Sequence, residues 1–278
     1  MSKRINIVAT IEPASANRKV LTQLIKSGVN TARLDFLSVD DKACLDSVKN
    51  IKKIIKTSKL NLDILLSLSD TGIKVGKINS HGQKLADQDI IILATHSDLA
   101  DVNIASLEYK VLPVSDEIKS VHLIKSDRIF IDQDRIKLLV DKIEDNLIYT
   151  KVIKTGMVQA GDQIIVSGYI FDIESRRSDI EIASKAKSDY LSLALANIAE
   201  LKKVKKILKK TDIKLIVRLE SLMQVKAIMK LVKLADGLFI DHQHLAWEVP
   251  ESKLDMIEKE LISKCHNINK EVMISSLS

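Results

Sequence analysis

The sequence predicts an α/β protein, built on a parallel sheet or barrel, that carries an inserted β-rich domain. Three observations support this fold class. The 278 residues are 46% hydrophobic but only 3% aromatic, so the core must be mainly aliphatic, as in parallel strands covered on both faces by helices. Short apolar runs alternate with amphipathic helical patterns in the first and last thirds of the chain. Between them, short β-like runs replace the helical patterns.

The first third of the chain has the β-α-β-α-β order that is typical of a parallel sheet or barrel. The patterns predict strands at residues 5–10, 30–36 and 62–68, and helices at 17–26 and 40–57. Ser15 is placed to cap the first helix. Gly28 is placed to end that helix in a left-handed backbone conformation.

The middle of the chain lacks long amphipathic helices. It contains six short β-like runs separated by turn residues, namely DIIILAT, EYKVLPV, RIFIDQD, IKLLVDKI, NLIYTKVI and QIIVSG. We therefore expect three segments: the first part of a barrel at 1–72, an inserted β-rich domain at 73–168, and the second part of the barrel at 169–278.

The last third returns to alternating helices and strands. The patterns predict helices at 173–187, 198–209, 222–234 and 251–268, and strands at 190–194, 214–219, 237–240 and 271–274. Together with the first third, these make seven barrel-like strands and no eighth.

Composition excludes several classes of protein. No apolar run is long enough to cross a bilayer, the first residues show no signal-peptide pattern, and two cysteines, Cys44 and Cys265, make a disulfide framework improbable. With 8 glycines, the chain has no Gly-rich phosphate loop. A cytoplasmic protein is expected.

The net charge is +6 and the isoelectric point is near 9.1. The lysines responsible cluster at 49–56 and 202–210, where apolar residues recur at helical spacing between them. We expect these runs to be the solvated outer faces of helices. No aromatic platform accompanies them, so nucleic acid is disfavoured as a partner.

Glu220, His242 and His244 fall just past the ends of two predicted strands. Sites in parallel barrels lie at the carboxyl ends of the strands, so these residues are candidates for a site. On an extended loop, alternate residues face the same side, so both histidines with Glu220 would suit zinc, manganese or iron. The alternative is a loop histidine that is hydrogen-bonded locally.

Seven segments of the chain resemble the motifs of one known family, and they occur in the same order around the inserted domain. They are TIEPAS at 10–15, ARLDF at 32–36, SDTGIK at 69–74, IDQD at 131–134, RLE at 218–220, ADGLFIDHQHLAWEVP at 235–250 and KCH with NK at 264–270. The last two resemble S-D-G-I-M-V-A-R-G-D-L-G-V-E-I-P and K-C-N-x-x-G-K. In this set of motifs the sequence resembles the pyruvate kinase family from about Arg4 to Ser278.

This resemblance implies a (β/α)8-type TIM barrel with a small β-barrel lid inserted after the third strand, here lacking the last barrel strand. A seven-stranded wall would leave the first and seventh strands with open edges. We therefore expect a homo-oligomer or a partner subunit to cover that gap.

The resemblance also implies the roles of individual residues. Arg33 matches a phosphate-binding arginine, although it is equally suited to a structural ion pair with Asp35 or Glu220. Arg218 stands at the position of a catalytic, substrate-binding lysine, Ser276 at that of a catalytic threonine, and Lys74 at that of a nucleotide-facing arginine. Magnesium would be held by Glu220 and by His244, which replaces an aspartate. Potassium would be held by Asp35 and Asp70, with Leu37 in place of a coordinating serine.

The family reaction is the glycolytic transfer of a phosphoryl group from phosphoenolpyruvate to ADP. Because metal, potassium and phosphate positions are substituted, we expect weak or absent kinase activity, a pseudoenzyme, with an anion-binding or interaction role. A phosphorylated small molecule or an oxo acid is the expected ligand. The alternative is a working enzyme: a divergent pyruvate kinase or a metal-dependent oxo-acid lyase that uses Glu220 and His244, with manganese or zinc suiting the imidazole better than magnesium.

Overall fold

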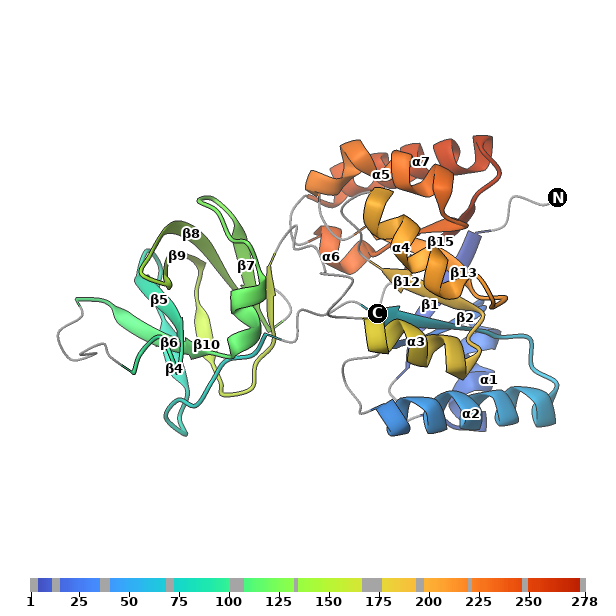
Figure 1. Ribbon diagram of the computed structural model, residues 1–278, viewed down its shortest axis with the longest axis horizontal. Helices are drawn as coiled ribbons and strands as arrows, with labels where there is room; N and C mark the ends of the chain where they lie inside the picture. The colour runs from blue at the N-terminus through green and yellow to red at the C-terminus, as the bar shows by residue number, and fades with distance from the viewer. Residues whose placement is uncertain are drawn as a thin grey trace. The chain divides into compact units, whose positions relative to one another are not determined.

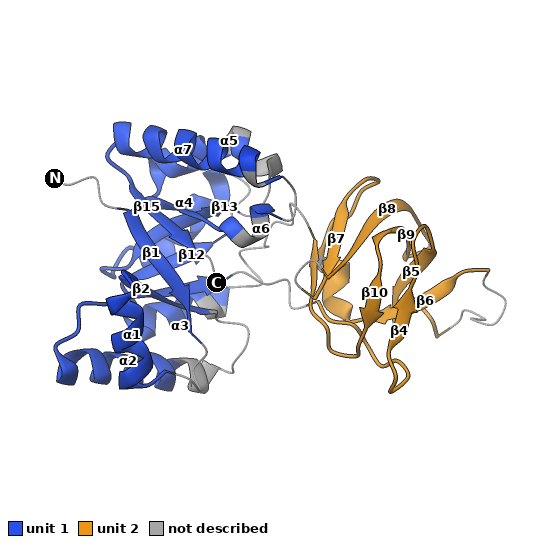
Figure 2. Cartoon of the chain, turned by 180° about the vertical axis from the view of Figure 1, so that it is seen from behind, with its two compact units in different colours: residues 1–69, 170–278 blue, residues 70–169 orange. Residues whose placement is uncertain are grey.

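The computed structural model describes residues 5–11, 16–35, 41–68, 73–100, 108–132, 135–166, 177–193, 198–219, 222–246 and 250–275. The chain forms two compact units (Figure 2). One comprises residues 1–69 and 170–278, and the other comprises residues 70–169. The second unit is therefore inserted into the sequence of the first.

Among the described residues, seven parallel strands close into a barrel in the first unit (Figure 1). They are β1 (Ile5–Thr10), β2 (Thr31–Asp35), β3 (Asp63–Leu68), β12 (Tyr190–Leu193), β13 (Lys214–Leu219), β14 (Gly237–Ile240) and β15 (Glu271–Ser275). The strands follow one another around the barrel in chain order. This confirms the predicted TIM-type architecture with seven strands.

The expectation of open strand edges at this wall is wrong. The first and last strands pair in parallel, with Ile5 opposite Val272 and Val8 opposite Ser275. Pairing satisfies the backbone N–H and C=O groups that an edge strand would expose, and closure removes the edge itself. A partner is therefore not needed to cover a gap between these strands.

Helices surround the barrel (Figure 1). They are α1 (Arg18–Lys26), α2 (Asp41–Ser58), α3 (Arg177–Ala186), α4 (Ile198–Leu208), α5 (Leu222–Leu234), the short α6 (His242–Ala246) and α7 (Glu251–Asn267). The helix α4 shows why they form: Leu201, Val204 and Leu208 are buried at helical spacing, while the lysines between them are exposed. The predicted assignment of the lysine runs to solvated helix faces is confirmed.

The first helix is capped by a different residue from the one predicted. The side chain of Asn17 accepts a hydrogen bond of 3.1 Å from the Val20 backbone N–H, which satisfies one of the free donors at the helix start. The predicted cap, Ser15, lies outside the described residues. Gly28 has φ +93, so the prediction of a left-handed residue after the helix is confirmed.

The inserted unit is built from strands, as predicted. They are β4 (Gln83–Leu85), β5 (Ile90–Thr95), β6 (Lys110–Val114), β7 (Arg128–Ile131), β8 (Ile136–Glu144), β9 (Leu147–Lys154), β10 (Gly156–Val158) and β11 (Ile164–Val166), with a 3-10 helix at Asp116–Ser120. Each of the six β-like runs of the sequence contains one of these strands.

Six of these strands form one mixed sheet in the order β11-β7-β8-β9-β5-β6. Lys74 bridges Gln163, next to β11, while its neighbour Val75 bridges Val114 in β6. Residues 74–75 thus connect the two ends of the sheet, which curls around its own apolar core, as a small β-barrel requires.

The interior of the larger barrel is filled by one inward-facing side chain from most strands. Val8, Leu65, Tyr190, Ile216, Phe239 and Met273 form this central apolar cluster. Because side chains alternate along a strand, the next inward positions toward the carboxyl ends lie one step above the cluster. The residues at those positions form the candidate site.

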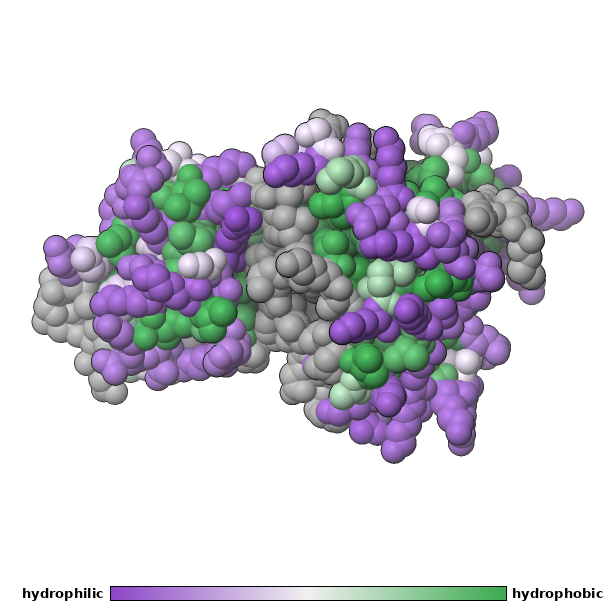
Figure 3. All heavy atoms as spheres, turned by 90° about the horizontal axis from the view of Figure 1, so that it is seen from above, coloured by the Kyte–Doolittle hydropathy of each residue, from purple (hydrophilic) through white to green (hydrophobic). Residues whose placement is uncertain are grey.

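On the face seen in Figure 3, hydrophilic side chains interrupt the apolar areas of both units. Among the described helices, none combines the length and the apolar content needed to cross a membrane.

Cys265 is a free thiol in the barrel unit, and burial raises its pKa to about 11.

We predict that Leu65→Ala lowers the free energy of unfolding by about 2–5 kcal/mol, because it opens a cavity inside the barrel where Leu65 is 0% exposed. Ile7→Ala is the matched control, since Ile7 lies on β1 but is 39% exposed. Urea unfolding followed by circular dichroism measures both. Equal losses in the two variants would contradict a packed barrel interior.

Candidate functional site at the carboxyl ends of the barrel strands

A layer of polar side chains lies above the apolar cluster, toward the carboxyl ends of the strands. Arg33, Ser67, Ser192, Arg218 and Asp241 are all buried. We call these five residues the polar layer. Each lies two residues after an inward-facing residue of its own strand and therefore faces inward as well. For Arg33 that preceding residue is Thr31, and for the other four it is a member of the apolar cluster. Buried polar groups in a barrel otherwise built of aliphatic side chains mark this end as the candidate site.

An ion pair joins two members of the polar layer. Arg33 Nη1 donates to Asp241 Oδ2 at 2.9 Å, and the two side chains are 8% and 2% exposed. The Arg33 guanidinium also lies over the Phe239 ring, with its carbon 5.5 Å from the centroid. Asp241 follows directly after β14. The end of β14 therefore brings a carboxylate against the arginine of β2, although the two residues are 208 positions apart in the sequence.

A second set of hydrogen bonds holds Arg218. Its Nη1 donates to Ser67 Oγ at 2.6 Å, and Ser192 Oγ donates to the same oxygen at 2.9 Å. All three residues are 0% exposed. The guanidinium is thus bonded within the barrel wall. The polar layer contains two arginines and one aspartate, so its formal charge is 2 − 1 = +1.

The two predicted histidines do not lie on an extended loop. Residues 242–246 form the helix α6. The side chain of His244 lies outside the described residues, so a metal site that joins both histidines to Glu220 stays a prediction. His242 Nδ1 is 2.8 Å from Glu258 Oε1 on α7, and its backbone N–H donates to Ser275 Oγ at 2.9 Å. The predicted local hydrogen bonding of His242 is confirmed.

The other predicted residues fall in three groups. Glu220, Asp70 and Ser276 lie outside the described residues. For Asp35, the last residue of β2, and for His244, within α6, the structure describes the backbone. Lys74 is exposed in the inserted unit, and its nucleotide role stays a prediction. Among the described side chains, no group of three histidine, cysteine or acidic residues is placed to hold a metal ion.

Sequence reasoning did not name Asp241 as a partner of Arg33. It named Asp35 or Glu220, whose side chains lie outside the described residues, so those pairings stay predictions. It also missed Ser67 and Ser192. A signal was present in each case. Asp241 is the first polar residue after the apolar strand GLFI. Ser67 interrupts the apolar run ILLSL, and Ser192 lies between the two leucines of YLSL. A polar residue at an inward position of a buried strand indicates a structural or functional partner.

A closed parallel barrel with buried polar side chains at the carboxyl ends of its strands belongs to the class of TIM-type barrel proteins. Comparison with known families narrows this class. The family model described as "Pyruvate kinase, barrel domain" matches residues 2–277. The chain belongs to the pyruvate kinase family.

The individual relatives are distant. The chain is 26% identical to the pyruvate kinase of Thermococcus litoralis over 282 residues, covering 99% of this chain and 58% of that protein. It is 28% identical to that of Buchnera aphidicola subsp. Schizaphis graminum, covering 96% and 57%. For Bacillus licheniformis the identity is 24%, covering 99% and 47%. The chain thus spans about half the length of these curated relatives.

We predict strong coupling between Arg33 and Asp241. Asp241→Asn and Arg33→Met should each lower the free energy of unfolding by about 3–5 kcal/mol, because each leaves a buried group without its ionic partner. The double variant Arg33→Met/Asp241→Asn should lose much less than the sum. Urea unfolding of the four proteins completes the double-mutant cycle. Additive losses would show that the pair is not coupled.

Proposed function

We propose that this chain is a pyruvate-kinase-like protein in which phosphoryl transfer from phosphoenolpyruvate to ADP is weak or absent, and that it acts as an anion-binding or interaction subunit. The observation that carries the proposal is the buried ion pair between Arg33 and Asp241. In the family motif that aligns with residues 235–250, alanine stands at the position of Asp241. In this chain the Asp241 carboxylate forms an ion pair with Arg33, the residue to which the resemblance gives the role of binding phosphate.

The pair opposes phosphate binding in two ways. A phosphate that approached Arg33 would have to compete with a carboxylate already at 2.9 Å from the guanidinium. It would also bring its own negative charge close to the Asp241 carboxylate, in surroundings where burial weakens solvent screening. Restoring the site therefore means breaking a buried ion pair, which costs several kcal/mol.

Arg218 supports the same proposal. The resemblance places a lysine there, as a compact cation that stabilises the transferred phosphoryl group. The guanidinium of Arg218 is planar and larger, and it is fully buried and bonded to Ser67. A cation tied into the barrel wall is poorly placed to follow charge as it develops on a ligand.

The substituted metal positions point the same way. Magnesium prefers oxygen ligands, and His244 offers an imidazole where the family has an aspartate. Leu37 offers no ligand atom at a potassium position. We propose that Glu220, with His244, retains at most a site for manganese or zinc. Asp35 and Asp70 are the proposed remnants of the potassium site.

The turnover assay is pyruvate formation from phosphoenolpyruvate and ADP with potassium, first under magnesium and then under manganese. We expect no turnover above that of Glu220→Ala, because the metal and phosphate positions are both altered. A wild-type rate that Glu220→Ala abolishes would contradict the proposal and favour a working divergent kinase.

The lyase alternative has its own outcome in the same experiment. Release of pyruvate from an oxo acid under manganese or zinc, lost in both Glu220→Ala and His244→Ala, would establish it. Asp255→Ala is the control, since Asp255 is exposed on α7 and should leave any activity unchanged.

A further inference from the structure

Two elements hold His242 at the carboxyl-terminal end of the barrel. Its ring Nδ1 is 2.8 Å from Glu258 Oε1 on α7, and its backbone N–H donates to Ser275 Oγ, at the end of β15, at 2.9 Å. The side chains of His242 and Glu258 are only 14% and 13% exposed. The residue before His242 is Asp241, which pairs with Arg33. The ion pair of the polar layer thus lies directly beside an anchored residue.

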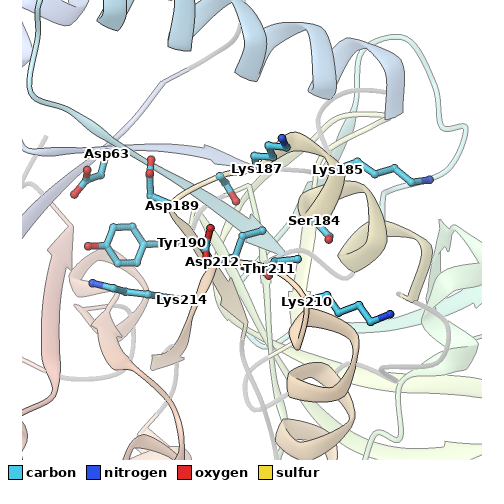
Figure 4. A pocket seen from close by; sticks show the side chains of 12 residues that line it. Asp63, Ser184, Lys185, Lys187, Asp189, Tyr190, Lys210, Thr211, Asp212 and Lys214 are labelled. Atoms are coloured by element: carbon cyan, nitrogen blue, oxygen red, sulfur yellow. Dashed lines mark hydrogen bonds between the residues drawn. The ribbon is translucent and has the colours of Figure 1, made fainter.

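The amino-terminal end of the barrel differs. A cavity of about 850 Å³ lies there, and its lining is rich in charged side chains. In Figure 4, Lys185 and Lys210 extend away from Asp189 and from Asp212. Side chains that diverge do not define one binding site. The bonds that meet at His242, by contrast, fix one part of the chain.

The helix α6 depends on the two attachments of His242. A helix of five residues is too short to be stable alone, so its stability comes from bonds to its surroundings. The His242 N–H is one of the donors at a helix start that have no partner within the helix, and Ser275 Oγ accepts from it. The Leu245 N–H donates to the Asp241 carbonyl at 3.1 Å. The backbone of Asp241 is therefore bonded to the first turn of α6.

The bond between His242 and Glu258 has a definite direction. A carboxylate only accepts hydrogen bonds, so Nδ1 of His242 carries the proton and donates to Glu258. A glutamine at position 258 would keep an acceptor oxygen, whereas an alanine would keep none. The two substitutions therefore separate the hydrogen bond from the charge of the carboxylate.

We propose that Glu258 is a positioning residue for the candidate site. Through His242 it fixes the start of α6, and this holds the Asp241 carboxylate against Arg33. A side chain of the helical layer around the barrel thereby keeps the arginine of the polar layer paired. This role rests on the proposed function in one respect, namely that the ion pair opposes phosphate binding.

The first test is a double-mutant cycle between Glu258→Ala and Asp241→Asn. The change in the unfolding equilibrium constant that Asp241→Asn causes should be at least about tenfold smaller in Glu258→Ala than in the wild type. The reason is that without Glu258 the carboxylate is no longer held on Arg33. Urea unfolding of the four proteins measures the coupling. A role of Glu258 in stability alone would give additive losses.

Three further variants control this cycle. Glu258→Gln keeps the acceptor and should leave the effect of Asp241→Asn as in the wild type. Glu260→Ala removes a carboxylate that is 57% exposed on the same helix, where it pairs with Lys264, and its loss should add to that of Asp241→Asn. Ser275→Ala removes the other anchor of His242 and should reduce the coupling as Glu258→Ala does. It also decides the question if Glu258→Ala does not fold.

The second test is the affinity for phosphoenolpyruvate, by calorimetry with manganese present. Glu258→Ala should bind phosphoenolpyruvate more tightly than the wild type, because Asp241 then competes less for Arg33. Glu258→Gln and Glu260→Ala should both match the wild type. A change in stability alone would not move the affinity of the folded protein in this pattern.

The two tests separate the positioning role from the proposed function. Additive losses for Asp241→Asn with both Glu258→Ala and Ser275→Ala would overturn the positioning role, whatever the ligand affinities. Coupling without any change in phosphoenolpyruvate affinity would support the positioning role and contradict the obstruction of phosphate by the ion pair.

Discussion

The hydrogen bonds between β1 and β15 are the contact on which the barrel depends. They join the first and last described strands of the wall, so that the backbone groups of both strands are paired rather than exposed. Closure also fixes which side chains face inward. The central apolar cluster and the polar layer above it both follow from that alternation.

Inside a closed barrel, charge has to be neutralised by neighbours. Arg33 meets this requirement through Asp241. Arg218 donates a hydrogen bond to Ser67, which also accepts one from Ser192, and these neutral hydroxyls solvate the charge without neutralising it. The same requirement limits what the site can bind. An arginine that is already paired with a carboxylate binds an incoming phosphate more weakly than an arginine without an ionic partner. The proposed loss of phosphoryl transfer therefore rests mainly on the electrostatics of the polar layer.

Much of the fold could be predicted from the sequence because its signals are local. The strands at 214–219 and 237–240 and the helix at 222–234 have the predicted limits, since apolar periodicity defines them. Each of the six β-like runs of the inserted unit contains a strand for the same reason. The short helix α6 was missed because five residues carry too little periodicity to separate a helical turn from a loop.

The site could be predicted less well because its contacts are between distant parts of the chain. Arg33 and Asp241 are 208 residues apart, and their pairing depends on how the strands are staggered around the barrel. Closure by β1 and β15 likewise depends on the tilt and stagger of all seven strands. Strand patterns alone gave no basis for that prediction, and the open edge was expected instead.

The measurement that tests this account most directly is the affinity of the folded protein for phosphoenolpyruvate, by calorimetry with manganese present. We compare the wild type with Asp241→Ala, which restores the family residue, and with Asp255→Ala, which removes an exposed carboxylate. The account predicts weak binding by the wild type, tighter binding by Asp241→Ala, and no change in Asp255→Ala. Tight wild-type binding that Asp241→Ala leaves unchanged would show that the ion pair does not obstruct the phosphate site.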